Sequence, residues 1–107
     1  MKKINIVKEK KDFDRAFKLR KQISSKYAFL YTYDTNSNYR FGICVSKKLG
    51  NAVTRNKIKR RVKDIIDKSK LQFKDKDYII VLKKSAASAK YLELKEDIEK
   101  LLKKINE

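Results

Sequence analysis

The chain has 107 residues, a length typical of one domain, and its hydrophobic fraction of 41% is enough for a core without disulfides or structural metals. Its 30 basic and 13 acidic residues give a net charge of +17, and an excess of this kind favours binding to nucleic acid. The absence of histidine excludes Ser-His, Cys-His and histidine-ligated metal catalysis within the chain.

The first 11 residues are polar and are expected to form an extended arm of a single domain spanning residues 1–107. They contain no apolar run typical of a secretion signal. No stretch of the chain approaches 18 apolar residues, so we expect no membrane partner. The lone Cys44 lies in an apolar run and has no internal disulfide partner, which is typical of an intracellular protein. We therefore expect a cytoplasmic location.

A helix is predicted over about residues 13–22, with Asp12 as its N-cap. Its apolar stripe follows the helical period and consists of Phe13, Ala16, Phe17 and Arg20. Residues 26–33 and 39–46 read as two strands around a turn cluster, so 26–46 is predicted to be a β-hairpin. One face of the first strand carries an aromatic row formed by Tyr27, Phe29, Tyr31 and Tyr33.

A second helix is predicted over about residues 52–69, after a turn at Gly50 and a cap at Asn51. Its apolar residues lie within about 100° of arc and are Ile58, Val62, Ile65 and Ile66. Asp75 to Asp77 is expected to be a loop.

Residues 77–83 form a continuous apolar run typical of a buried strand, and a last helix is predicted over about 90–105. Strand, helix and strand over 39–83 indicate a βαβ unit. The class is therefore α+β with one mixed sheet.

The basic residues gather at the start of the second helix. Residues 45–61 contain seven Lys or Arg and no acid. Arg55, Lys59 and Lys63 recur every four residues and form a row about 12 Å long, which matches neighbouring phosphates. A solvated helix face normally carries acidic partners. Cations in the first turns also oppose the helix dipole, at about 0.3–1 kcal/mol each. This pattern favours an RNA or DNA ligand over a solvated face.

The aromatic residues permit two interpretations. A row of rings would stack on unpaired bases, at about 1–3 kcal/mol per base, whereas any single ring is more simply a core residue. The tyrosines favour a surface that is partly wet. The acidic pairs Asp64/Asp67 and Asp75/Asp77 lie among lysines, so metal-dependent catalysis by them is disfavoured.

From Arg40 to Arg60 the chain resembles the signature of the bacterial ribonuclease P protein subunit, R-x-G-x-x-V-S-K-K-x-G-x-A-V-x-R-N-x-x-K-R. Every fixed position of that pattern is present. Further matches, which extend the resemblance over nearly the whole chain, are Phe13, Phe17, Tyr31 and Asp77-Tyr-Ile-Ile-Val. The family usually has Arg where Lys57 stands and often has Arg where Lys63 stands, and a lysine at these positions does not form the bidentate phosphate contact of an arginine.

The resemblance implies an α/β sandwich of order αβββαβα, with a mixed four-stranded sheet, a left-handed βαβ crossover and a likeness to ribosomal proteins. It implies a subunit of ribonuclease P that binds the catalytic RNA and the single-stranded 5′ leader of precursor tRNA. Chemistry would belong to Mg²⁺ held by the RNA, with no cofactor on the protein and no small-molecule substrate.

By this match the aromatic residues would hold the leader in a cleft between the sheet and the first helix, and the basic helix would face the catalytic RNA. The expected RNA-binding residues are Lys47, Lys48, Arg55, Asn56, Lys57, Lys59, Arg60, Lys63, Phe13, Phe17 and Tyr31. Two alternatives stay open. One is a ribosomal or other structural RNA-binding protein, and the other is a DNA-binding module whose basic helix enters a major groove.

Overall fold

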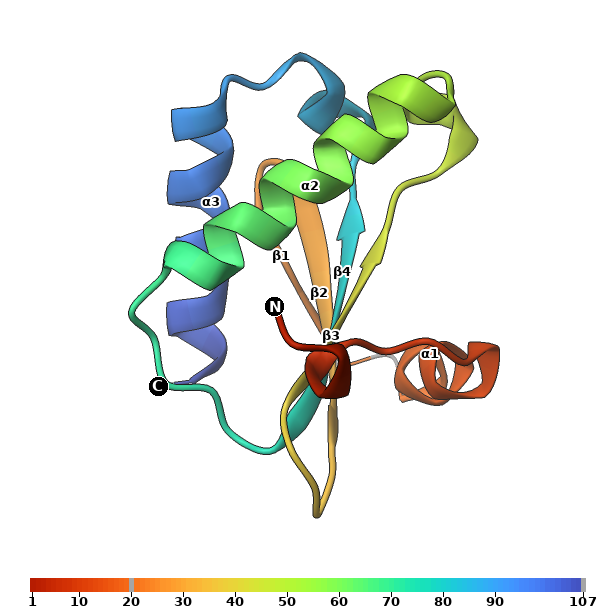
Figure 1. Cartoon of the computed structure of the whole chain (residues 1–107), viewed down its shortest axis with the longest axis vertical. Helices are drawn as coiled ribbons and strands as arrows, with labels where there is room; N and C mark the ends of the chain where they lie inside the picture. Colours follow the sequence, from red (N-terminus) through yellow and green to blue (C-terminus); the bar gives the residue numbers. More distant parts are fainter. Residues whose placement is uncertain (20, 107) are drawn as a thin grey trace.

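A mixed four-stranded sheet forms the middle layer of the protein (Figure 1). The structure is a computed structural model that describes residues 1–19 and 21–106. The strands lie in the order β1-β2-β4-β3. Their bounds are Gln22–Ser24 (β1), Ala28–Asp34 (β2), Arg40–Cys44 (β3) and Lys76–Leu82 (β4).

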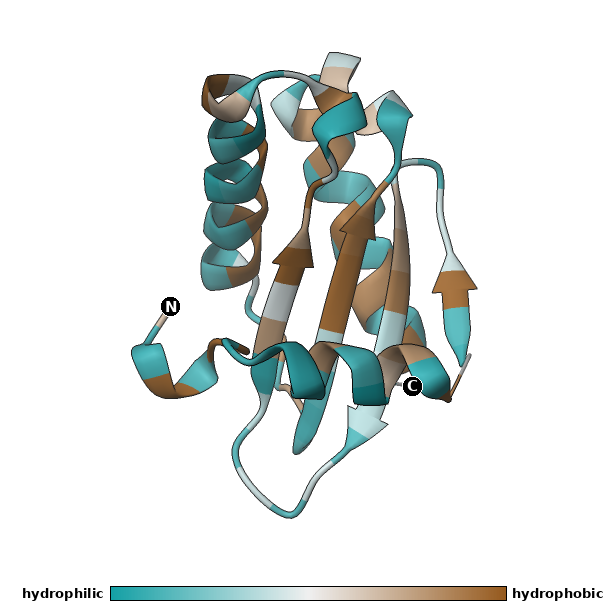
Figure 2. Ribbon diagram, turned by 90° about the vertical axis from the view of Figure 1, so that its right-hand side faces the viewer, coloured by the Kyte–Doolittle hydropathy of each residue, from teal (hydrophilic) through white to brown (hydrophobic). Residues whose placement is uncertain are grey.

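Three α-helices cover the two faces of this sheet. They are Lys10–Lys18 (α1), Ala52–Lys68 (α2) and Tyr91–Ile105 (α3), and three short 3-10 turns span Lys3–Asn5 (η1), Lys47–Leu49 (η2) and Lys84–Ser88 (η3). Helices α2 and α3 lie on one face, and α1 crosses the other (Figures 1 and 2). No helix in the described part of the chain is long and apolar enough to cross a membrane.

The predicted hairpin over residues 26–46 is wrong, because β4 lies between its two strands. β4 pairs antiparallel with β2 and parallel with β3, so Ile79 has Tyr31 on one side and Gly42 on the other. The short strand β1, which the sequence pattern did not reveal, forms the hairpin with β2. A buried, apolar strand such as β4 is best placed in the middle of a sheet, where both its faces are covered.

The larger core lies between the sheet and the helices α2 and α3. It contains the predicted apolar stripe of α2 and, from α3, Leu94, Ile98, Leu101 and Leu102. A smaller cluster under α1 is built on Val7, Ala16 and Ile79. Tyr27 belongs to the larger core and precedes β2, so its predicted place in the aromatic row is wrong.

Several boundaries near the N-terminus also differ from the prediction. Helix α1 begins at Lys10, with Glu9 at the N-cap position, and Asp12 is a buried residue within its first turn. The helix ends at Lys18, and Arg20 lies outside the described residues. Residues 1–11 are not an extended arm, because they include η1 and the first turn of α1.

The predicted loop at 75–77 is too long, because β4 begins at Lys76, one residue before the predicted strand at 77–83. Asp77, which the two predicted segments shared, lies inside β4 and is fully buried, with its carboxylate paired as described below. The later elements match closely. Asn51 caps α2 by accepting a hydrogen bond at 2.9 Å from the backbone N–H of Thr54. The parallel β3-α2-β4 unit is confirmed, and its left-handed sense stays a prediction.

Candidate nucleic-acid interface

The basic residues of the sequence lie on η2 and on α2. Lys47 and Lys48 are exposed on η2, which follows directly from β3. Gly50 then adopts a φ of 141°, and a Cβ there would lie 3.0 Å from two side-chain atoms of Thr54. The turn therefore requires glycine. It sets η2 against the first turn of α2, so that the cations of both segments share one region.

Six further predicted residues lie on α2. Asn56, Lys57, Arg60 and Lys63 are exposed, and Arg55 and Lys59 are half-buried. At 100° per residue, Arg55, Lys59 and Lys63 follow one flank of the helix, whereas Lys57 points about 160° away from Arg55. By the same count Arg60 lies about 140° from Arg55, so Lys57 lies beyond Arg60 at the far edge of the exposed cations. We call the full set the basic surface: Lys47, Lys48, Arg55, Asn56, Lys57, Lys59, Arg60 and Lys63.

The cations of the basic surface have no acidic partner. Within residues 1–19 and 21–106, the ion pairs involve other side chains. The Nε of Arg55 is buried and has no hydrogen-bond partner there. A buried, unpaired guanidinium nitrogen costs free energy, and the uncompensated cations repel one another. A polyanionic ligand would relieve the repulsion between the cations.

Three of the predicted aromatic residues, Phe13, Phe17 and Tyr31, meet on the opposite side of the sheet, and we call them the aromatic face. All three are half-buried and pack on the small cluster under α1. The Phe17 and Tyr31 rings meet edge to face, with centroids 4.9 Å apart. Such a contact fixes ring orientation. The set is therefore partly core and partly surface, as expected for residues that could also contact a base.

Phe13 lies directly over Gly42 of β3. A Cβ at Gly42 would lie 2.5 Å from Cε1 of Phe13, 2.8 Å from Cζ of Phe13 and 3.0 Å from Cδ1 of Ile79. The missing side chain thus gives the phenyl ring its place on the sheet. This contact explains why a glycine occurs inside an otherwise regular strand.

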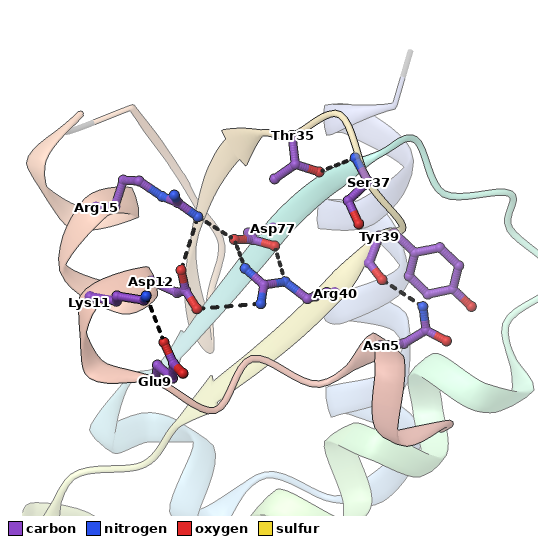
Figure 3. Close-up of polar contacts among 10 residues, drawn as sticks. All are labelled: Asn5, Glu9, Lys11, Asp12, Arg15, Thr35, Ser37, Tyr39, Arg40 and Asp77. Atoms are coloured by element: carbon purple, nitrogen blue, oxygen red, sulfur yellow. Dashed lines mark hydrogen bonds and ion pairs between the residues drawn. The ribbon is translucent and has the colours of Figure 1, made fainter.

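An ionic network fastens α1 to the sheet (Figure 3). Arg40 donates from Nε to Oδ1 of Asp77 at 2.8 Å and from Nη2 to Oδ2 at 2.7 Å. Asp12 of α1 accepts from Arg40 at 3.4 Å and from Arg15 at 3.0 Å. Arg15 also lies 3.5 Å from Asp77 and covers the Tyr33 ring, 4.3 Å from its centroid.

The network holds two arginines and two carboxylates, so its charges balance. The hydrogen bonds to Asp77 raise the pKa of Arg40 further above its ordinary value. Because Asp12 and Arg15 belong to α1, these contacts set the distance of the helix from β3 and β4. The network therefore positions Phe13 and Phe17 without itself being part of the aromatic face.

The basic surface begins beyond the end of β3 that α1 leaves uncovered. Figure 2 shows α1 crossing the strands near one end and leaving the other half of this face without a helix. Cys44, the last residue of β3, pairs with Val81 of β4 and packs on the cluster under α1, and the basic surface begins three residues later. Burial raises the pKa of Cys44, and the charge of Lys59 opposes that shift.

Sequence reasoning missed several residues around these surfaces. Lys83 places its Nζ 4.4 Å from the Phe29 centroid and donates to Ser24 Oγ at 2.7 Å. Its only sequence signal was its position directly after the apolar strand. Arg40 and Asp77 belong to the motifs of the resemblance, but nothing local indicated that they pair. No group of three or more His, Cys, Asp or Glu suited to a metal lies within the described residues.

Comparison with known proteins decides the family. A family model described as Ribonuclease P matches residues 1–106. The chain belongs to the ribonuclease P protein family. It is 37% identical over 106 residues to the ribonuclease P protein component of Bacillus velezensis, covering 97% of this chain and 91% of the relative. It is 36% identical over 104 residues to that of Streptococcus pyogenes serotype M5, covering 96% and 87%.

Solved structures agree with this placement. The ribonuclease P protein of Staphylococcus aureus superposes with a TM-score of 0.88 at 33% identity, over 96% of both chains. That of Thermotoga maritima gives a TM-score of 0.84 at 28% identity, over 92% of this chain and 94% of the other. The family and the α+β fold expected from the sequence are confirmed. Membership assigns the ribonuclease P protein a role in the ribonuclease P complex and in tRNA processing.

Proposed function

We propose that this ribonuclease P protein binds the catalytic RNA through its basic surface and the single-stranded 5′ leader of precursor tRNA through its aromatic face. The leader then lies against protein while the RNA subunit cuts it from the tRNA. Family membership supports the assignment to the complex. The division of labour between the two surfaces rests on their chemistry.

The observation that carries this proposal is the row of unpaired cations on a rigid helix, together with half-buried rings on the opposite side of the sheet. Arg55, Lys59 and Lys63 have no acidic partner in the described residues. Their helix is fixed to the core from Ile58 onward, through Ile58, Val62, Ile65 and Ile66. Fixed cations bind phosphates without the entropy loss of ordering a flexible chain. Rings such as Tyr31 recognise bases only where those bases are unpaired.

The chemistry itself is assigned to Mg²⁺ bound by the RNA subunit, since the chain has no histidine and no side-chain set for acid–base catalysis. The protein contributes fixed positive charge beside the substrate. This charge replaces part of the diffuse Mg²⁺ that the RNA alone needs. The effect is greatest when Mg²⁺ is scarce.

The test is cleavage of a precursor tRNA by a bacterial ribonuclease P RNA at low Mg²⁺, with and without the protein. The wild-type protein should stimulate cleavage strongly, and the double variant Arg55→Ala, Lys59→Ala should lose most of that stimulation. A matched control, Lys103→Ala with Lys104→Ala, removes the same charge from exposed positions of α3 and should behave as the wild type. No stimulation by the wild type, with tight binding to another RNA, would move the function to structural RNA binding.

A further inference from the structure

The N-terminal segment from Lys2 to Lys8 is part of the folded protein. The side chain of Asn5 donates to the carbonyl oxygen of Tyr39 at 2.6 Å (Figure 3). The N–H of Val7 donates to the carbonyl oxygen of Phe41 at 2.9 Å. Asn5 and Val7 are buried. These contacts hold the segment against the outer edge of β3, so its exposed side chains have fixed positions.

Those exposed side chains are cationic. Lys2, Lys3 and Lys8 are exposed, and none of them has an ion-pair partner within the described residues. Lys11, in the first turn of α1, differs from these three because it pairs with Glu9 at 3.1 Å. Three unpaired lysines on an ordered segment have the same character as the row on α2.

The segment lies beside the C-terminal end of α2. The terminal amine of Met1 pairs with Asp67 of that helix at 2.8 Å, and Figure 1 shows the segment running in front of the β3 edge, between α2 and α1. Lys2 lines a groove that also contains Ile66 and Asp67 of α2. Lys3 and Lys8 line a second depression, together with Glu9 and Asp12. The segment therefore places one lysine in the groove and two more outside it.

This groove is open and has a volume of about 990 Å³. Tyr39 and Phe73 line it, with ring centroids 5.2 Å apart. The side chain of Ile4 on its rim is 60% exposed. Its one acidic lining residue, Asp67, is paired with the terminal amine at 2.8 Å. The groove thus combines partly accessible rings, polar groups and a cationic border.

We propose that the N-terminal segment and this groove form a second contact with the RNA subunit. Lys2, Lys3 and Lys8 bind phosphates, and the groove receives an unpaired nucleotide of that RNA. The inference rests on the proposed function. RNA is the occupant because the exposed lysines of the segment have no ion-pair partner within the described residues, and because an aromatic, half-polar groove that contains Lys2 suits a base and its phosphate. The leader is not the occupant, since the aromatic face lies on the other side of β3.

The first test measures how the affinity for ribonuclease P RNA depends on salt. The triple variant Lys2→Ala, Lys3→Ala, Lys8→Ala should reduce the slope of log K against log salt by about 3, one unit per lost phosphate contact. The matched control replaces three exposed lysines of α3, Lys100, Lys103 and Lys104, by Ala, and should keep the wild-type slope. Equal slopes for both variants would overturn the proposal.

The second test locates the RNA. Gln72, which is exposed on the groove, is replaced by Cys in a Cys44→Ala background and carries a photoactivated crosslinker. We expect Gln72→Cys to crosslink to one segment of the RNA subunit, as Lys63→Cys does, and Lys100→Cys not to crosslink. Crosslinking at Lys63→Cys without any at Gln72→Cys would overturn this inference alone. Failure of the wild type to bind the RNA would overturn the proposed function as well.

Discussion

Arg40 binds the buried carboxylate of Asp77 through two parallel hydrogen bonds of 2.8 and 2.7 Å. The two residues face each other on neighbouring parallel strands, and the same guanidinium reaches Asp12 of α1 at 3.4 Å. A bidentate arginine–carboxylate pair is rigid as well as strong. One residue thus joins β3, β4 and the helix that carries Phe13 and Phe17, two of the three residues of the aromatic face.

Replacing Arg40 should therefore affect both stability and leader binding. Arg40→Ala leaves Asp77 buried with only the longer contact to Arg15, and the free energy of unfolding should fall by about 3 kcal/mol. Arg40→Lys should restore part of this loss, because a lysine keeps the positive charge but cannot form the two parallel hydrogen bonds of a guanidinium group. Denaturant unfolding of the three proteins checks the order.

The matched control is Lys11→Ala. Its pair with Glu9 is exposed at both ends, 80% and 63%, so the loss should be below about 1 kcal/mol. In the ribonuclease P complex, Arg40→Lys should weaken binding of a leader-bearing substrate while affinity for the RNA subunit stays unchanged. If Arg40→Ala lowers the free energy of unfolding no more than Lys11→Ala does, the ionic network does not have the stabilising role assigned to it.

Gly42→Ala tests the close contact beneath Phe13. The added methyl would force the phenyl ring from its place and should destabilise the protein by about 1–3 kcal/mol. A second substitution, Phe13→Leu, removes the ring edge and should recover part of that stability. Thermal unfolding of the single and double variants measures this coupling. If the stability losses of the two single variants simply add in the double variant, the added methyl at position 42 does not clash with the ring at position 13.

Cys44 should react slowly with alkylating agents at neutral pH, because burial raises the pKa of its thiol above the ordinary value. A thiol whose pKa is higher in the folded protein than in the unfolded chain contributes stability that is fully present below the unfolded pKa. This stability is lost as the pH rises through the folded pKa, so it should decline in alkaline solution. Rates of alkylation against pH check the shift. Lys59→Ala should slow the reaction further. An unchanged rate would show that the charge of Lys59 does not influence the Cys44 thiol.

Leader binding should depend strongly on salt. If about six phosphates of a single-stranded leader were contacted, log K against log salt would have a slope near −4. Titration of a labelled leader oligonucleotide between low and moderate salt measures it. A slope near zero would contradict the electrostatic account of this surface.

Much of the fold follows from local patterns in the sequence. The apolar stripe of Ile58, Val62 and Ile65 identified α2, and Asn51 was correctly predicted as its cap. The sheet order was missed because pairing is not local. Two strands joined by a short turn pair with each other by default, and nothing in residues 26–46 indicated that β4 would lie between them.

The ionic network shows the same limit. Asp12 looked like an N-cap because acids favour helix starts, yet its partner Arg40 lies 28 residues away. Asp77 looked like a loop residue beside Asp75, and only the facing Arg40 explains its burial. The cationic row was predictable because a helix fixes the spacing of its own residues. The position of this row relative to the aromatic residues was not predictable, because it depends on the order of the strands in the sheet.

The central claim is that the leader contacts the aromatic face and the RNA subunit contacts the basic surface. The most direct measurement is the ratio of affinities of the assembled complex for precursor tRNA with and without its leader. Tyr31→Ala should lower this ratio by about 5- to 150-fold, the loss of one stacked base, and leave affinity for the RNA subunit unchanged. An unchanged ratio, or an equal loss of RNA-subunit affinity, would contradict the account.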